Sequence, residues 1–234
     1  MKHTFLSFNP DHCTLDSTRI DIWQYPLKSL FPNAESLLNA DELIRAKRYH
    51  FERHRRRFTI ARATLRLILS RYINIPAQDI VFGENEYGKP TCLNQPKLQF
   101  NLSHSEELAL LAIGQDYPLG IDLEFFADRP FEGIGNQMFS DAENQALQSS
   151  PRAIKPLAFF HIWAQKEALI KACGMGLSYP TKEFDVPALP STNQIILDTK
   201  HKKTWQMVSF HPQVNCCAAL CYDSNVKTIQ YHCL

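Results

Sequence analysis

The chain has 234 residues, of which 44% are hydrophobic and 21% are charged, and its formal net charge at pH 7 is +1. These values are typical of a globular protein with one large domain or two small ones, and they argue against a molecule drawn as a whole to polyanions. The sequence shows neither an apolar run long enough for a membrane span nor an apolar signal core, so we expect no membrane insertion and no export.

The seven cysteines are odd in number and include no Cys-x-x-Cys pair. Three of them, Cys216, Cys217 and Cys221, lie in an apolar run, which is typical of reduced thiols in a protein core. We therefore expect a reducing, cytoplasmic compartment.

The first elements that we expect are a strand at residues 20–25, where polar and apolar residues alternate, and a helix with Asp41 as its N-cap. The spacing of apolar residues then predicts an amphipathic helix from Arg53 to Tyr72. Its polar side is expected to carry Arg55, Arg62 and Arg66.

This helix belongs to a strongly basic region, because nine Lys or Arg residues and one acid lie between Arg45 and Arg66. Such a region has three interpretations: a solvated helix face, a site for a nucleic-acid backbone, or a site for the phosphates of a small ligand. No nucleic-acid-binding motif accompanies it, and the helix alone leaves all three open.

Short strands are expected next, at residues 80–82, 98–102 and 108–113. Between the first two, Gly88-Lys89-Pro90 forms a turn that exposes one lysine. The second strand runs into Ser103-His104-Ser105, which is either a capped turn or a cluster of ligand-facing donors. The turn is the favoured interpretation of this segment alone.

Acidic and apolar residues alternate in Gly120-Ile121-Asp122-Leu123-Glu124, which predicts a strand. Asp122 and Glu124 would then share one face, where a hard cation such as Mg²⁺ would relieve the repulsion between the two carboxylates. The alternative is a solvated strand edge with two exposed acids.

Residues typical of helix ends mark the two helices that follow. Ser140 and Glu143 have the spacing of a capping box, and a long helix at residues 158–173 is closed by Gly174. Within this helix one face carries Trp163, Glu167 and Lys171; the last two could also form a simple surface ion pair. Further strands are expected at residues 194–197, 204–210 and 216–222.

If the long helix brings Glu167 to Asp122 and Glu124, the site has three carboxylates and no Cys or His ligand, a set that suits magnesium rather than zinc. Lys and Arg side chains beside such an ion are typical of a phosphate site. From the residues alone we therefore expect a Mg²⁺-dependent transfer that involves a diphosphate.

Four motifs occur in order: Gly88-Lys89-Pro90, Phe100 to Ser105, Gly120 to Glu124, and Trp163 to Lys171, the last extended by Gly174 and Gly176-Leu177-Ser178. Together, over about residues 41–186, they resemble the 4'-phosphopantetheinyl transferases of the surfactin-synthetase-activating type. None of the motifs is specific by itself, but their order and spacing are.

The resemblance implies that coenzyme A donates its phosphopantetheine arm to a serine of an acyl or peptidyl carrier protein, with release of 3',5'-ADP. It implies an α+β fold, a pseudo-dimer of two similar halves, each a helix on a small, mostly antiparallel sheet. We place the coenzyme A-binding basic residues in the half 1–115, and the metal-binding acids and catalytic helix in the half 116–234. Because both halves share one chain, we expect a monomer.

The resemblance also implies roles for individual residues. The Mg²⁺ ligands would be Asp122, Glu124 and Glu167, and Glu167 would also act, directly or through water, on the proton of the attacking serine. Lys171 would hold the diphosphate, and His104 would lie near the 3'-phosphate. The catalytic candidates are therefore Glu167, Lys171 and His104. The expected coenzyme A contacts are Arg45, Arg62, Lys89, Ser103, His104 and Lys171.

Two other functions stay open on the sequence: a non-catalytic module that binds coenzyme A or a nucleotide, and a nucleic-acid binder built on the basic helix. We expect neither a nucleic acid nor a membrane as partner. The sequence does not name the carrier protein. Since carrier proteins are acidic, basic residues near Arg53 to Arg57 are candidates for the docking surface.

Overall fold

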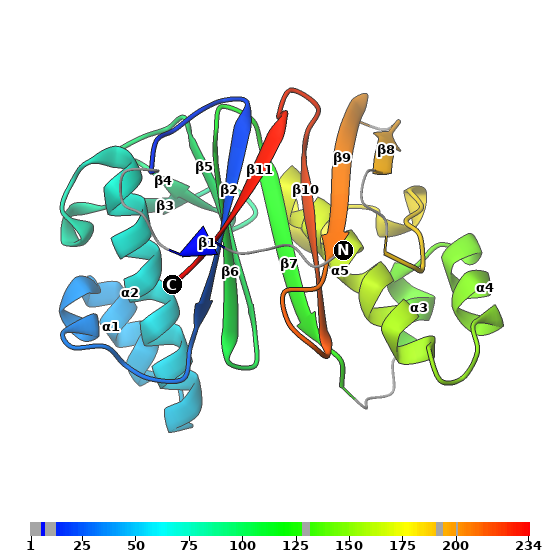
Figure 1. The fold of residues 1–234 in the computed structure, drawn as a ribbon, viewed down its shortest axis with the longest axis horizontal. Helices are drawn as coiled ribbons and strands as arrows, with labels where there is room; N and C mark the ends of the chain where they lie inside the picture. The colour runs from blue at the N-terminus through cyan, green and yellow to red at the C-terminus, as the bar shows by residue number, and fades with distance from the viewer. Residues whose placement is uncertain (1–5, 8–12, 128–131, 191–193, 200) are drawn as a thin grey trace.

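Two β-sheets pack against each other and helices cover their outer faces, so that the computed structural model has four layers (Figure 1). The structure describes residues 6–7, 13–127, 132–190, 194–199 and 201–234. Each half places a long helix on one sheet, which confirms the α+β fold of two similar halves expected from the sequence.

Among the described residues, the first sheet has the strand order β1 (Leu6–Ser7), β11 (Thr228–Cys233), β2 (Arg19–Pro26), β6 (Leu108–Gln115) and β5 (Leu98–Ser105). The second has the order β7 (Leu119–Phe125), β10 (Cys216–Asp223), β9 (Lys203–Phe210) and β8 (Gln194–Asp198). A small separate sheet pairs β3 (Phe82–Glu84) with β4 (Pro90–Cys92). Within these sheets β11 runs parallel to β1 and β2, and the other pairs are antiparallel.

The two faces of each sheet bury different residues because side chains alternate along a strand. In β6, Leu108 and Leu110 face the second sheet, while Ala109 and Leu111 face helix α2 (Glu52–Ile73). The second sheet packs in the same way, with helix α5 (Lys155–Cys173) on its outer face. One apolar layer therefore lies between the sheets, and one lies under each long helix.

Both long helices were expected, and their ends have local causes. The last turn of α5 stops at Gly174, whose φ of 70° is left-handed and favours glycine. Helix α4 (Asp141–Ser149) begins with the predicted capping box of Ser140 and Glu143. The remaining helices are α1 (Ala40–Lys47), α3 (Glu132–Met138) and short 3₁₀ helices at Ala34–Leu37, Ala77–Asp79, Gly176–Ser178 and Thr181–Glu183.

Three local expectations are wrong. Helix α1 is capped by Asn39 instead of Asp41, because the Asn39 side chain accepts a hydrogen bond from the Glu42 backbone N–H at 2.9 Å and Glu42 returns one. The strand expected at residues 80–82 begins only at Phe82. Ser103-His104-Ser105 is not a turn, because it continues β5 and pairs with β6.

The prediction for Arg66 is also wrong, because this residue does not lie on a polar side of the helix. It is fully buried, and its guanidinium donates to Glu42 and to the carbonyl oxygens of Ala77 and Ile80 at 2.8–3.0 Å. These bonds compensate a buried charge and tie α2 to the loop that follows it.

Polar side chains of β5 join the two sheets at their edges. Asn101 Oδ1 accepts from the Ile121 backbone N–H at 2.8 Å, and two serine hydroxyls, Ser103 and Ser105, accept from the next alternate N–H groups of β7, those of Leu123 and Phe125, at 3.2 Å. Residues two apart on β5 thus satisfy the unpaired edge of β7. We name this row the side-chain ladder; it fixes the register between the halves.

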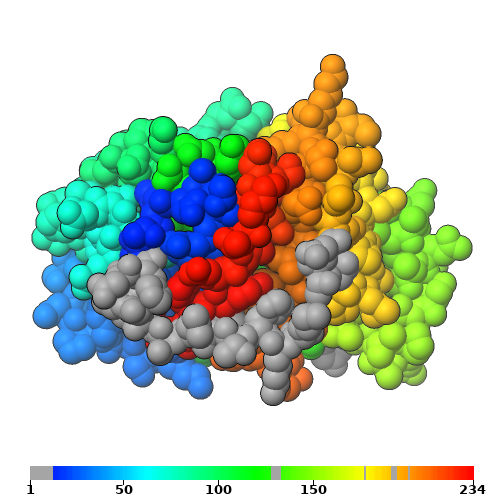
Figure 2. All heavy atoms as spheres, turned by 45° about the horizontal axis from the view of Figure 1, so that its top comes forward, coloured from blue at the N-terminus to red at the C-terminus, as the bar shows by residue number. Residues whose placement is uncertain are grey.

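The last described strand returns to the first half. Strand β11 follows the second sheet in the chain but pairs with β2 from Thr228–Arg19 to Cys233–Gln24. Figure 2 shows β11 (red) lying directly beside β2 (blue) on one face of the molecule. The two halves are therefore linked by this strand as well as by the side-chain ladder, and the division of the chain at residue 115 stays a prediction.

The described part of the chain contains all seven cysteines, each as a free thiol. Cys216, Cys217 and Cys221 are buried in β10, as expected for core thiols. Within the described ranges, no helix combines the length and the apolar character that crossing a membrane requires.

Candidate functional site

Asp122 is the centre of the candidate site. Its side chain is buried on β7, where Oδ1 accepts from the Lys171 ammonium at 2.5 Å and from the Ser103 hydroxyl at 2.9 Å. Lys171 also donates to Ser103 Oγ at 3.1 Å. The other carboxylate oxygen, Oδ2, is buried with no hydrogen-bond partner among the described residues. An orphaned, charged oxygen of this kind is a candidate ligand position.

Gly120 brings helix α5 close enough for these contacts. A Cβ atom at this position would lie 2.2 Å from the Ala168 carbonyl oxygen and 2.3 Å from the Ala172 nitrogen, both backbone atoms of α5. The absence of a side chain therefore lets the helix backbone lie directly on β7. As a result, the residues of α5 one turn apart, Glu167 and Lys171, face Asp122.

We expect Gly120→Ala to displace α5 and to destabilise the protein by several kcal/mol, because overpacking against a rigid backbone costs roughly 1–3 kcal/mol or more. The matched control is Gly133→Ala, since a Cβ at that helical position meets nothing within 4 Å. Thermal unfolding of the two variants checks this. Equal melting temperatures would show that α5 does not depend on the close approach.

Glu167 lies one turn before Lys171 and is half-buried. Burial raises the pKa of its carboxyl, and the negative charge of Asp122 raises it further, while Lys171 acts in the opposite direction. The side chain lines a cavity of about 300 Å³ together with Lys171, Lys89 and Asn101. The structure therefore joins Asp122, Glu167 and Lys171, of which the helix periodicity predicted that Glu167 and Lys171 share one face.

Glu124 occupies the next position on the same face of β7, and its Oε1 accepts from the Trp163 indole N–H at 3.0 Å. The sequence placed Trp163 on the helix face of Glu167 but gave it no role. Across the described ranges, no three His, Cys, Asp or Glu side chains form a ready metal-binding group. The three carboxylates expected to bind the metal therefore do not form a ready metal-binding group in this structure. Asp122 instead accepts a hydrogen bond from Lys171.

Lys89 lies at the same cavity, with its ammonium directed between the halves. Nζ donates to the carbonyl oxygens of Leu119 at 2.9 Å and Ala172 at 3.2 Å, one from β7 and one from α5. Burial lowers the pKa of this lysine to about 8. Lys89 therefore links β7 to α5 and also lies beside the expected ligand site.

This pKa predicts a stability effect above neutral pH. Between about pH 8 and pH 10 the unfolded chain keeps a proton on Lys89 that the folded chain loses, so the free energy of unfolding rises with pH. Lys89→Met removes this contribution. We expect the melting temperature of the parent to rise relative to that of the variant over this range. The exposed control Lys97→Met should follow the parent in parallel as pH changes. If the melting temperature of Lys89→Met also ran parallel to that of the parent, the lowered pKa of Lys89 would be contradicted.

A second cavity, of about 220 Å³, adjoins the first. Its basic groups are Arg45, Arg62 and His104, and its apolar walls include Phe58 and Phe100. The two cavities share Pro90, Asn101 and Leu102 in their walls and therefore lie side by side. We name the pair the basic cleft. Together with Asp122 and Ser103 at its Lys171 end, it gathers the expected coenzyme A contacts.

The arginines of the basic cleft are held by partners that sequence reasoning missed. Arg62 donates to the buried Glu42, and its guanidinium lies 4.2 Å from the Phe82 ring centroid, while Arg45 lies over Phe58 at 5.3 Å. Burial would raise the pKa of Glu42, but hydrogen bonds from Arg66, the Asn39 N–H and Arg62 hold it below its usual value. The Asn39-x-x-Glu42 spacing of a capping box was the available signal.

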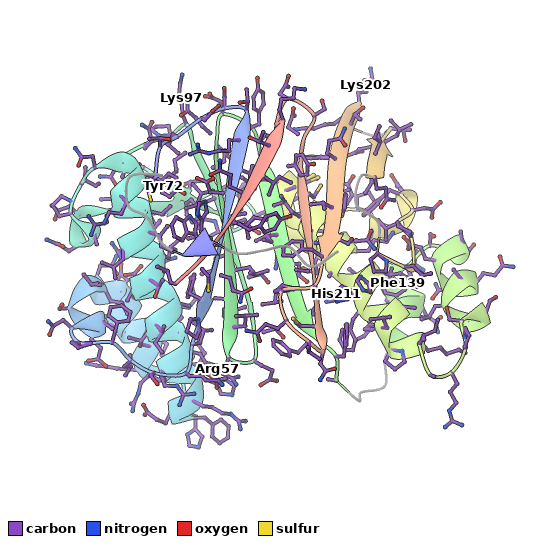
Figure 3. All side chains as sticks on the ribbon, viewed as in Figure 1. Arg57, Tyr72, Lys97, Phe139, Lys202 and His211 are labelled. Atoms are coloured by element: carbon purple, nitrogen blue, oxygen red, sulfur yellow. The ribbon has the colours of Figure 1, made fainter. Side chains whose placement is uncertain are left out.

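Other basic residues of α2 are neutralised on the protein itself. Arg56 and Arg57 donate to Glu107 at 2.9 and 2.8 Å, and Arg57 also pairs with Glu106. Arg57 is labelled at the lower end of the molecule in Figure 3. His104 lies nearby, and the residue as a whole is exposed to solvent. Its ring is nevertheless partly desolvated, which lowers its pKa, and the charges of Lys171 and Arg57 lower the pKa further.

Comparison with known proteins finds matches to both halves of the chain. A model of the 4'-phosphopantetheinyl transferase superfamily matches residues 118–221, and a model described as 4'-phosphopantetheinyl transferase, N-terminal, matches residues 22–115. The 4'-phosphopantetheinyl transferase HetI of Nostoc sp. is 36% identical over 229 residues, which cover 94% of each chain. The chain belongs to the 4'-phosphopantetheinyl transferase superfamily.

More distant relatives carry the same description. The transferase psf-1 of Bacillus pumilus is 36% identical over 140 residues, 59% of each chain. The transferase Sfp of Bacillus subtilis is 26% identical over 202 residues, 84% of this chain and 89% of its own. Membership of this transferase family confirms the enzyme class expected from the motifs, with coenzyme A as donor and a carrier protein as acceptor.

Proposed function

We propose that this chain uses Mg²⁺ to transfer the 4'-phosphopantetheine arm of coenzyme A to a serine of an apo acyl or peptidyl carrier protein, releasing 3',5'-ADP. The observation that carries the proposal is the cluster of Asp122, Glu167 and Lys171, in which Glu167 and Lys171 line the basic cleft and the buried Asp122 accepts from Lys171. Carboxylates for a cation thus stand beside ammonium and guanidinium groups for phosphates, as a diphosphate transfer requires.

The shape of the basic cleft suits a long anionic donor. The cavity with Arg45, Arg62 and His104 beside aromatic walls would take the nucleotide, its base on the rings and its 3'-phosphate on the cations. The adjoining cavity with Lys171 and Lys89 would take the diphosphate. In this arrangement the main contribution of Ser103 is its hydrogen bonds with Asp122 and Lys171, and direct contact with the donor contributes less.

The donor atoms at Asp122 fit a magnesium ion. Oδ2 of Asp122 lacks a hydrogen-bond partner among the described residues, and Glu167 lies close enough for the Asp122 charge to raise its pKa. One or two carboxylates with substrate phosphates and waters are a ligand set that Mg²⁺ prefers. Asp122, Glu167 and Glu124 would hold the ion, and the bound ion would stabilise negative charge on the diphosphate.

The side chains of the protein perform the remaining steps. The carrier serine oxygen forms a bond to the phosphorus that bears the pantetheine arm, and the bond from that phosphorus to the oxygen of 3',5'-ADP breaks. Glu167 accepts the serine proton, directly or through a water, and the direction of its pKa shift, upward, makes its carboxylate a stronger base than an exposed glutamate. Lys171 binds the diphosphate oxygens, and His104 contacts the 3'-phosphate end.

The start of α2 is the proposed docking surface for the carrier. Arg53 lies over the ring of Phe51 at 5.3 Å, and the exposed side chain of Phe51 adds apolar surface beside it. An acidic helix with an apolar face would complement this combination. We further propose a cytoplasmic monomer, because the thiols are free and both halves share one chain.

Mass spectrometry of an apo carrier protein tests the proposal. After incubation with this chain, coenzyme A and Mg²⁺, the carrier should gain the mass of one phosphopantetheine arm, and 3',5'-ADP should appear in equal amount. Chelation of the metal should stop both. Coenzyme A binding without any mass gain across several carriers would instead indicate a non-catalytic module.

A further inference from the structure

The Lys171 ammonium takes the place that a metal ion would need. It lies 2.5 Å from Asp122 Oδ1 and donates to Ser103 Oγ, which itself donates to the same carboxylate oxygen. Asp122 is thus neutralised in the structure by a side chain of its own protein. Its Oδ2 stays unpartnered among the described residues, so the carboxylate is only half satisfied.

Lys171 is also placed to leave this position. Its side chain is 27% exposed, whereas that of Asp122 is 5% exposed, and it lines the cavity of about 300 Å³. A lysine carries its charge on a flexible stem with three rotatable donors, so the ammonium can reach a new acceptor without backbone movement. The end of the basic cleft provides the room for that acceptor.

A divalent ion at Asp122 and Glu167 would repel an ammonium bonded to the same carboxylate. Diphosphate oxygens in the cavity would attract both cations and give Lys171 a second acceptor of higher charge than Asp122. Donor binding would therefore free Asp122 Oδ1 for the ion. In the absence of donor, the Lys171 ammonium would compete with the ion for Asp122 Oδ1.

We propose that Lys171 is a resident counter-ion that occupies Asp122 in the donor-free enzyme and transfers to the diphosphate, so that metal and donor bind cooperatively. This inference rests on the proposed function and assigns the lysine a second position in the same site. Since coupling between two ligands is reciprocal, coenzyme A should tighten the metal by the same factor by which the metal tightens coenzyme A.

Titration calorimetry with Mn²⁺, on the full chain without carrier, tests the exchange. In the absence of coenzyme A, Lys171→Met should bind Mn²⁺ about tenfold more tightly than the parent. Saturating coenzyme A should tighten Mn²⁺ binding to the parent by about tenfold or more, and should tighten the variant much less. The control is Lys97→Met, which removes an equal charge from a 71% exposed side chain, labelled at the upper end of the first sheet in Figure 3.

Two results would overturn the inference. Equal donor-free Mn²⁺ affinity of the parent and Lys171→Met would show that the lysine does not compete, and an equal effect of coenzyme A on both would show that it does not couple the ligands. If Lys171→Met does not fold, Lys171→Gln serves the same comparison. Loss of carrier modification in the mass assay is a separate result that bears on the proposed function alone.

Discussion

Asp122→Asn should slow carrier modification by about 10³-fold while the protein stays folded. The amide keeps an oxygen that can accept from Lys171 and Ser103, so the packing around β7 is preserved. It loses the charge that would hold the ion. If that ion supplies about 4 kcal/mol of transition-state stabilisation, transfer slows by roughly 10³-fold. Initial rates with apo carrier protein, together with a thermal melt, measure the two effects separately.

The control for this variant is Asp116→Asn. Asp116 is an exposed acid in the turn before β7 with φ of 64°, a conformation that asparagine adopts readily. We expect its rate and melting temperature to match those of the parent. Near-normal Mg²⁺-dependent turnover by Asp122→Asn would remove this residue from the metal site.

Glu167→Gln should have the second largest effect, since the residue is both a proposed metal ligand and the proposed base. Loss of a general base costs roughly 10²–10⁴-fold in rate. A general base must be ionised to accept a proton, so the activity of the parent should fall at acidic pH, where the Glu167 carboxylate becomes protonated. In Glu167→Gln this acidic limb should be absent from the residual activity.

The pH profile of the rate under saturating donor measures this limb, and calorimetry of coenzyme A binding shows that the cleft is intact. Glu35→Gln, an exposed acid in the first 3₁₀ helix, provides the charge-matched control. A residual activity of Glu167→Gln that keeps the same acidic limb would mean that another group accepts the serine proton.

Several features of the site followed from periodicity alone. Alternation along β7 put Asp122 and Glu124 on one face, and helical spacing put Glu167 and Lys171 on one face of α5. Both rules are local, so they do not depend on knowing how the halves pack. The long helices and most strands could be predicted for the same reason.

What could not be predicted depends on contacts between distant segments. The place of Ser103 in the side-chain ladder is one such feature, because only the pairing of two sheet edges reveals it, while its expected contact with the donor stays a prediction. Arg66 looked solvated because its partner Glu42 comes from another helix. Strand β11 was missed since its parallel pairing with β2 joins segments from opposite ends of the chain.

The return of β11 to the first sheet has a consequence for synthesis on the ribosome. Residues 228–233 follow the whole of the second sheet in the chain, yet β2 pairs with them along six positions. The first sheet therefore stays incomplete until after the second sheet has been translated, although the strands of the second sheet can pair before then. Termination upstream of β11 would leave one side of β2 unpaired and prone to association.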